Sequence, residues 1–243
     1  MKLHRTIVSD EEARKRIDAS AYLTLIYREI YETFFRETGR NKDLRVLEIG
    51  AGSTSFGEKF WPTIQKTSYS NQGGTKAEDL KFEPNSFDLI LAKDVLHHIK
   101  DIPRAFRVFE EILVPGGKVL ASEPSWSLLG RFVYRFLHEE EWRVESHFKF
   151  EETDAWESNQ ALILNLLRLD DSKRLDILSN LKITVLGSTY GISYLLSGGV
   201  YSPTRIPSKF LLFIHKKFGG LRKKYQQLFS LNRIVSFEKS IDA

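Results

Sequence analysis

A loop with two closely spaced glycines is the part of this sequence best suited to chemistry. Glu48 follows an apolar run, and Gly50 and Gly52 come next, on either side of Ala51. Glycine lets the backbone turn tightly and lie against a ligand where a side chain would clash. Unpaired N–H groups at the start of a following helix favour polar, nucleotide-like ligands. We therefore expect residues 54–60 to form a helix and the loop before it to bind such a ligand.

The spacing of the glycines argues against one class of nucleotide-binding enzyme. The dinucleotide-binding fingerprint has a third glycine three positions after the second. Ser55 occupies that position, and the next glycine is Gly57. A nicotinamide-dependent dehydrogenase is therefore disfavoured.

Candidate acids and bases follow two other predicted strands. Asp94, His97 and His98 come after one of them, at the edge where open α/β sheets bind ligands. His98 is a candidate general base because the pKa of histidine lies near working pH. Glu123, at the end of the next strand, is the second candidate. Packing at a helix start for the histidines, and helix capping for Glu123, are the alternatives that the sequence leaves open.

A largely parallel sheet must position these residues. Gln72 to Gly74 leaves no room for a full helix, so we expect a short third strand, or none, before Ala77. The other expected strands are buried apolar runs between turn residues. They lie at 44–47, within 63–71, and at 87–92, 118–122, 182–186 and 234–238, the last one antiparallel.

Three stretches besides residues 54–60 are expected to be helical. Residues 1–43 form a helical preface with a near-helical apolar spacing, in which Ser9 is placed as an N-cap ahead of three acids. Asp101 is placed as the N-cap of a helix that runs through Leu113 and is stopped at residues 115–117. The long connection over 201–231 is rich in Lys and Arg and precedes the last strand.

Length and composition fit a soluble globular protein. The 243 residues suffice for one large α/β domain with additions, and 42% are hydrophobic and 28% charged. There is no cysteine, hence no disulfide or thiolate site, which fits a reducing, cytoplasmic setting. We expect no secretory signal and no spanning helix, because no apolar run is long enough. The formal charge of +4 does not by itself indicate nucleic acid.

Five blocks in a fixed order resemble a class I S-adenosylmethionine-dependent methyltransferase over about residues 44–124. Their order and spacing together are more specific than any one of them. The blocks are Val46 to Gly52, Ala77 to Leu80, Asn85 to Ile90, Val95 to Ile99 and Leu113 to Val119. The resemblance implies a doubly wound Rossmann-like sheet, here with N-terminal helices and an α-rich insertion before the last strand. The expected divisions are a preface at 1–43 and a domain at 44–243, with its core at 44–124, acceptor-side additions at 125–231 and the last strand at about 232–238.

The same resemblance implies S-adenosylmethionine as the methyl donor, and we expect no metal. The residues that it assigns to the donor are Glu48, Gly50, Ala51, Gly52, Tyr69, Glu78, Asp79 and Asp94. Two positions depart from the family pattern. Tyr69 stands where an acid usually accepts both ribose hydroxyls, and Lys76 stands where an aspartate often reaches the adenine amine. Glu78 or Asp79 could substitute after a small shift of the loop.

Beyond residue 124 the chain resembles one bacterial branch of methyltransferase-like proteins, often associated with surface-polysaccharide biosynthesis. Residues 127–140, 158–161 and 194–200 carry this narrower likeness. It implies methyl transfer to a hydroxyl, or less readily an amine, of a sugar, polysaccharide or lipid-linked glycan acceptor. The alternative is a non-catalytic relative used in binding or assembly, which Tyr69 and Lys76 favour.

The segment 209–224 combines apolar residues with lysines and arginines. Such a segment can lie on an anionic membrane, which would make the protein peripheral at the inner face of the membrane. An ordinary amphipathic helix packed on the core has the same pattern. Nucleic acid is disfavoured because no recognisable binding motif accompanies the charge.

Overall fold

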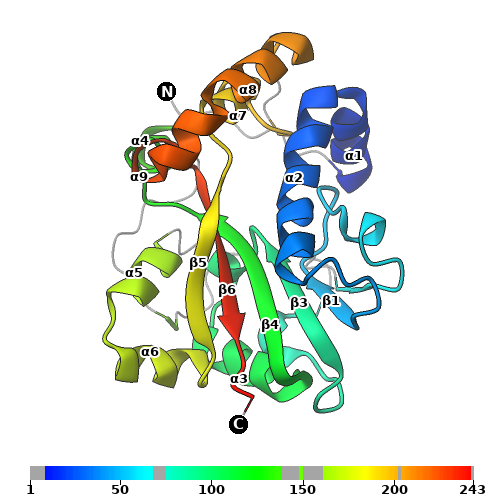
Figure 1. Cartoon of the computed structure of the whole chain (residues 1–243), viewed down its shortest axis with the longest axis vertical. Coiled ribbons are helices and arrows are strands. Elements are labelled where there is room, and N and C mark those ends of the chain that lie inside the picture. Colours follow the sequence, from blue (N-terminus) through cyan, green and yellow to red (C-terminus); the bar gives the residue numbers. More distant parts are fainter. Residues whose placement is uncertain (1–8, 68–74, 138–147, 150–160, 202–203, 242–243) are drawn as a thin grey trace.

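The fold is a mixed six-stranded sheet with helices on both faces (Figure 1). The computed structural model describes residues 9–67, 75–137, 148–149, 161–201 and 204–241. The strands are β1 (Val46–Ile49), β2 (Gln65–Lys66), β3 (Phe87–Lys93), β4 (Leu113–Pro124), β5 (Lys182–Thr189) and β6 (Asn232–Glu238).

The order of the strands is β2-β1-β3-β4-β6-β5. β2, β1, β3 and β4 pair in parallel, and β6 is antiparallel to both β4 and β5. β1, β3, β4 and β5 therefore end at one edge, where open α/β sheets bind ligands. The doubly wound sheet with an antiparallel last strand agrees with the prediction.

Alternation along each strand separates two apolar layers. Leu47, Ile90 and Val119 belong to one buried cluster, while Leu89 and Leu120 belong to the other. Successive side chains of a strand point to opposite faces, so each face must be covered. Helices α3 (Ile102–Ile112), α5 (Leu162–Arg168) and α6 (Asp171–Leu178) cover the first face. Helices α1 (Asp10–Ala19), α2 (Ala21–Glu37), α4 (Leu128–Phe136) and α8 (Ser208–Lys224) supply the second cluster.

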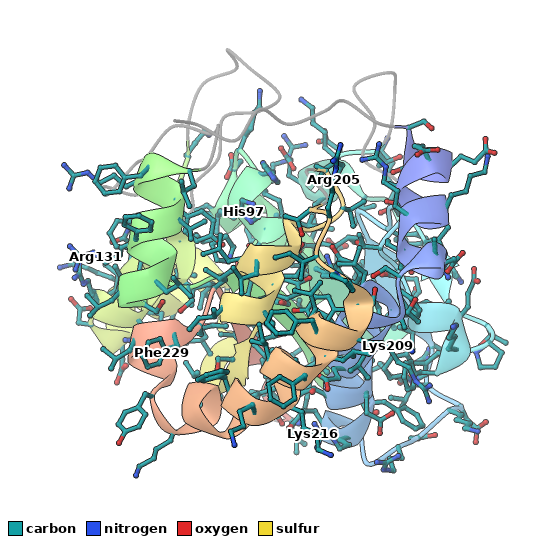
Figure 2. The ribbon with its side chains drawn as sticks, turned by 90° about the horizontal axis from the view of Figure 1, so that it is seen from above. His97, Arg131, Arg205, Lys209, Lys216 and Phe229 are labelled. Carbon is teal, nitrogen blue, oxygen red and sulfur yellow. The ribbon has the colours of Figure 1, made fainter. Side chains whose placement is uncertain are left out.

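Local capping explains where several helices begin. The Ser9 hydroxyl accepts from the Glu12 N–H at 3.2 Å, and the Asp101 carboxylate accepts from the Arg104 N–H at 3.0 Å. The predicted helices after Ser9 and Asp101 are thus confirmed. Two short helices, α7 (Ile192–Ser197) and α9 (Gln226–Phe229), complete the connections around α8. Figure 2 looks down on this end of the molecule.

The prediction of a helix over residues 54–60 is wrong. Only a single 3-10 turn, η1 (Gly57–Lys59), forms there. A Cβ on Gly57 would lie 2.6 Å from Ile64 Cδ1 and 2.9 Å from Glu48 Oε2. The chain therefore passes close to β1 and β2, and the room that a full helix needs is already filled.

The second strand lies within the predicted residues 63–71 and has two residues. No strand forms over the described residues 75–86, in line with the expected short third strand or none. The predicted start of the strand at 118–122 needs correction. β4 begins at Leu113, where it pairs with Phe87, instead of at Lys118. Gly116, with a φ of +75°, lies in an irregular part of this strand instead of separating it from the helix.

The connections at the carboxyl edge contain two further 3-10 turns, η2 (Ala77–Asp79) and η3 (Leu96–His98). Within the described residues, no helix combines the length and the apolar character needed to cross a bilayer.

Candidate functional site

A pocket of about 180 Å³ opens at the carboxyl ends of β1 and β3. Short loops after three strands and the turn η2 form its wall, which contains both apolar and charged side chains. The lining residues are Ile49, Gly50, Thr67, Thr75, Lys76, Ala77, Glu78, Asp94, Val95, His98, Ile99 and Lys100.

Gly50 is the residue of the glycine loop that reaches the pocket. Its φ is +62°, and a Cβ there would lie 2.5 Å from Val95 Cγ2. Both the left-handed backbone and the close approach of the next loop therefore require glycine. The Ala51 N–H donates to the Thr67 carbonyl at 2.9 Å, which joins the loop to the segment after β2. Ala51 and Gly52 are not among the residues that line the pocket.

Glu78 and Asp79 differ in where their carboxylates lie. Glu78 lines the pocket and is 9% exposed, and burial raises the pKa of its carboxyl. The neighbouring charges of Asp79 and Asp101 raise that pKa further. Asp79 instead accepts a hydrogen bond from Arg104 Nη2 at 2.6 Å, away from the lining residues. Of the two alternatives, the structure places only Glu78 in the pocket.

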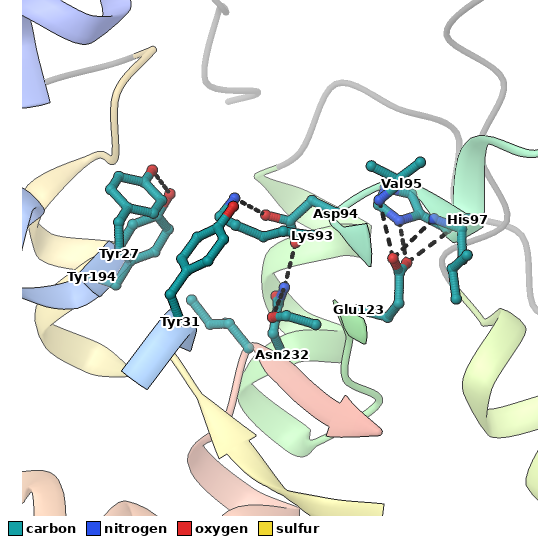
Figure 3. A network of polar contacts seen from close by, with 12 residues as sticks. Tyr27, Tyr31, Lys93, Asp94, Val95, His97, Glu123, Tyr194 and Asn232 are labelled. Carbon is teal, nitrogen blue, oxygen red and sulfur yellow. Dashed lines mark hydrogen bonds and ion pairs between the residues drawn. The ribbon is translucent and has the colours of Figure 1, made fainter. Parts of the chain in front are cut away.

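Asp94 joins the pocket to a polar network on the other side of β3 (Figure 3). Lys93 Nζ lies 2.6 Å from Asp94 Oδ2, and Asn232 Nδ2 donates to Asp94 Oδ1 at 2.5 Å. Lys93 Nζ is also 4.9 Å from the centre of the Tyr27 ring. These contacts hold Asp94 at a φ of +54°, a backbone conformation that few non-glycine residues adopt.

Glu123 holds the loop that carries His98. Its buried carboxylate accepts from the backbone N–H groups of Val95, Leu96 and His97 at 3.0, 2.9 and 3.2 Å. Glu123 Oε2 also lies 2.6 Å from His97 Nδ1 (Figure 3). The carboxylate therefore accepts from three backbone N–H groups, lies against a ring nitrogen of His97 and does not line the pocket. This geometry favours the capping alternative for Glu123, and its role as a base stays a prediction.

His98 is the candidate base that the structure brings to the pocket. It lines the same wall as Asp94, and its ring centre lies 4.1 Å from that of His97. Glu123 thus acts on His98 indirectly, because it fixes the backbone of η3 and the neighbouring ring.

Glu48 does not line the pocket, and its assignment to the donor stays a prediction. Its carboxylate accepts hydrogen bonds from the hydroxyls of Tyr31 on α2 and of Ser55, the latter at 2.7 Å. Burial raises the pKa of the Glu48 carboxyl, and these two hydrogen bonds oppose the rise. Glu48 therefore joins α2 to the glycine loop.

Three tyrosines, two of them buried, form a cluster that sequence reasoning missed. The hydroxyls of Tyr27 and Tyr194 are 2.9 Å apart, and the rings of Tyr190 and Tyr194 are stacked at 4.1 Å. Tyr190 has a φ of +55°, and its hydroxyl has no hydrogen-bond partner among the described residues. Burial raises the pKa of each phenol. The tyrosines come from α2 and from the segment after β5, so no local pattern could have joined them.

Two other predictions have different outcomes. Tyr69 lies outside the described residues, whereas Lys76 lines the pocket beside Ala77 and Glu78. In the described part of the chain, no three His, Asp or Glu side chains are grouped to hold a metal.

Comparison with known proteins shows what this fold and the segment around the glycine loop are similar to. Residues 47–121 match the family model of a methyltransferase domain. A solved S-adenosylmethionine-dependent methyltransferase from Archaeoglobus fulgidus has the same fold, with a TM-score of 0.50 and 11% identity over 87% of this chain and 94% of that one.

Two curated relatives match parts of the chain. An uncharacterised methyltransferase of Bacillus subtilis, YcgJ, is 27% identical over 139 residues, which are 47% of this chain and 54% of the relative. Phosphoethanolamine N-methyltransferase 1 of Arabidopsis thaliana is 50% identical over 42 residues, 17% of this chain and 9% of the relative. The chain thus spans about half of one relative and about a tenth of the other. Residues 47–121 are thus similar to a methyltransferase domain, and the fold of the chain is that of a solved methyltransferase.

Proposed function

We propose that this protein transfers a methyl group from S-adenosylmethionine to a hydroxyl of a sugar, polysaccharide or glycolipid intermediate. The observation that carries the methyl transfer is the pocket beside Gly50, which combines Glu78, Asp94 and His98 within the matched domain. The hydroxyl acceptor rests on the sequence resemblance of the segments after residue 124.

The residues of the pocket fit such a donor. Gly50 lines the pocket, and the close approach of Val95 and a positive φ require glycine there, so the backbone of the loop can face a ligand. Carboxylates only accept hydrogen bonds when ionised, and Glu78 and Asp94 would hold hydroxyl or amino groups of the donor. Ile49 and Ile99 supply apolar surface against which the adenine ring of the donor can lie. When bound, the donor supplies a methyl group on a positively charged sulfur.

His98 would orient the acceptor or take its proton. The imidazole lies in the pocket wall, and Glu123 fixes the backbone that carries it. A positioned base typically contributes a rate factor of about a hundred or more. Methyl transfer is an in-line displacement, for which positioning alone supplies much of the rate.

An amine acceptor is the second candidate, and one contact favours it. The Lys93 ammonium lies over the Tyr27 ring and beside Asp94, so this region accommodates an ammonium group. One curated relative is by name a phosphoethanolamine N-methyltransferase.

A non-catalytic protein that uses the same fold is the remaining alternative. Lys76 lines the pocket, and an ammonium can only donate hydrogen bonds. If Lys76 excludes the donor, the chain serves in binding or assembly.

The test is transfer of labelled methyl from S-adenosylmethionine to a panel of acceptors. The panel contains bacterial glycolipid extract, soluble oligosaccharides and phosphoethanolamine. We expect label in the carbohydrate fractions, and about a hundredfold less with His98→Asn. Asp79→Asn is the matched control, because Asp79 contacts Arg104 outside the pocket. Label in phosphoethanolamine alone would replace the hydroxyl acceptor by an amine, and no transfer to any acceptor would contradict the proposal.

A further inference from the structure

One helix presents aromatic rings and lysines together to solvent. On α8, Phe210 and Phe213 are 53% and 61% exposed, and Lys209, Lys216 and Lys217 are exposed around them. At 3.6 residues per turn, these five positions fall within about one third of the helix circumference. We propose that this α8 face docks the protein on an anionic membrane surface.

The opposite side of α8 fixes the helix against the molecule. Leu211 and Ile214 are buried, and His215 Nε2 lies 3.1 Å from Glu29 Oε2 on α2. The rings of Phe210 and Phe213, 6.5 Å apart, are therefore held outward by the packing of the other side. Large exposed apolar groups of this kind commonly mark an interaction site.

The charge of α8 is entirely of one sign. Lys or Arg occupies six of its 17 positions, and it contains no Asp or Glu. The whole chain has 36 basic and 32 acidic residues, so this helix concentrates positive charge that the rest of the chain balances. A second copy of the chain would bring two such faces together with like charges, which disfavours self-association there.

Helix α4 also exposes apolar residues next to basic ones at this end of the molecule. Its exposed apolar residues recur every four positions and are flanked by two exposed arginines. They are Leu128 at 62%, Phe132 at 52% and Phe136 at 51%, with Arg131 and Arg135. The short helix α9 contacts both α4 and α8. In the view from above, Phe229 of α9 lies between Arg131 and Lys216 (Figure 2).

This combination fits a lipid surface of negative charge. Aromatic rings favour the boundary between headgroups and acyl chains, and each nearby lysine adds about fivefold in affinity for anionic lipid. The α7–α8 segment follows the carboxyl end of β5, the edge of the sheet at which the pocket also lies. Docking would therefore bring that edge toward the lipid. The inference does not depend on methyl transfer.

The experiment is co-sedimentation of the full chain with lipid vesicles. One set is pure phosphatidylcholine, and the other contains about one third phosphatidylglycerol. We expect binding to the anionic vesicles alone, weakened by salt. Phe210→Ser/Phe213→Ser and Lys209→Glu/Lys216→Glu should each weaken it at least about tenfold.

The matched control changes the same charge elsewhere. Lys173→Glu/Lys182→Glu alters two exposed lysines of α6 and the start of β5, away from α8, and should bind as the wild type does. Thermal unfolding of each variant checks that these exposed substitutions leave the fold intact.

Three results would overturn the inference. They are equal binding to both vesicle types, wild-type binding by both α8 variants, and no vesicle binding by the wild-type chain. Binding of an RNA oligonucleotide that needs Lys209 and Lys216, without vesicle binding, would assign the face to nucleic acid instead.

Discussion

Glu48 and Glu123, near the ends of β1 and β4, have a different role from Glu78, which lines the pocket. Glu48 and Glu123 are buried and accept hydrogen bonds from neighbouring segments, so they join parts of the protein to one another. Glu78 lies in a one-turn helix and faces the pocket. An acid at a strand end is thus no sufficient sign of ligand binding, because the donors packed around it decide what it does.

Removal of the Glu123 carboxylate should have the largest effect on stability. Glu123→Ala leaves the N–H groups of Val95, Leu96 and His97 buried without their acceptor. We expect a loss of about 3–5 kcal/mol in the free energy of unfolding, measured by urea denaturation. A loss below about 1 kcal/mol would contradict the claim that the Glu123 carboxylate holds the loop after β3 in place.

The glycine loop allows a matched comparison. Gly50→Ala must adopt a φ of +62° with its Cβ 2.5 Å from Val95 Cγ2. We expect a loss of about 2–3 kcal/mol in stability, together with weaker donor binding. At Gly52, a Cβ would only reach ordinary contact at 3.7 Å from Asp10. Gly52→Ala should therefore be close to neutral, and equal effects of the two substitutions would refute the account of Gly50.

The hydroxyl of Tyr31 tests whether Glu48 holds α2 to the glycine loop, and the hydroxyl of Tyr190 serves as the comparison. Tyr31→Phe removes a donor to the buried carboxylate and should cost about 1–2 kcal/mol in urea denaturation. Tyr190→Phe removes a buried hydroxyl without a hydrogen-bond partner among the described residues, so stability should stay the same or rise. A larger loss of stability in Tyr190→Phe than in Tyr31→Phe would contradict the claim that the Tyr31 hydroxyl stabilises the buried Glu48 carboxylate.

The pH dependence gives the smallest and most specific effect. Burial raises the pKa of Glu48 in the folded protein above the ordinary value of 4.5, so the folded state binds the proton more tightly than the unfolded state. The contribution of Glu48 to the free energy of unfolding should therefore fall as pH rises from 4.5 through the raised pKa. In urea denaturation at a series of pH values, wild type minus Glu48→Gln should show this fall. A difference between the two proteins that stays constant with pH would contradict the raised pKa.

Much of the fold could be predicted because its signals are local. Ser9 and Asp101 each provide a cap with the right spacing, and the apolar run over 87–92 is a buried strand by composition alone. The lack of a helix after the glycine loop could not be read locally. It depends on how closely Gly57 approaches Glu48 and Ile64.

The site was predicted in part, for the same reason. Four of the predicted residues lie in or next to recognisable sequence motifs and line one pocket, namely Gly50, Glu78, Asp94 and His98. The roles of Glu48 and Glu123 depend on Tyr31, Ser55 and the loop after β3, which tertiary packing brings to them. The tyrosine cluster joins segments more than 160 positions apart, so periodicity within either segment gives no sign of it.

The most direct test of the account is calorimetric titration with S-adenosylhomocysteine of the wild type, Glu78→Gln and Asp79→Asn. The pair of variants compares neighbouring acids, one lining the pocket and the other bound to Arg104. We expect micromolar binding by the wild type, about tenfold weaker binding by Glu78→Gln and unchanged binding by Asp79→Asn. No measurable binding by the wild type at millimolar ligand, or an equal loss in both variants, would contradict the claim that this pocket holds the methyl donor.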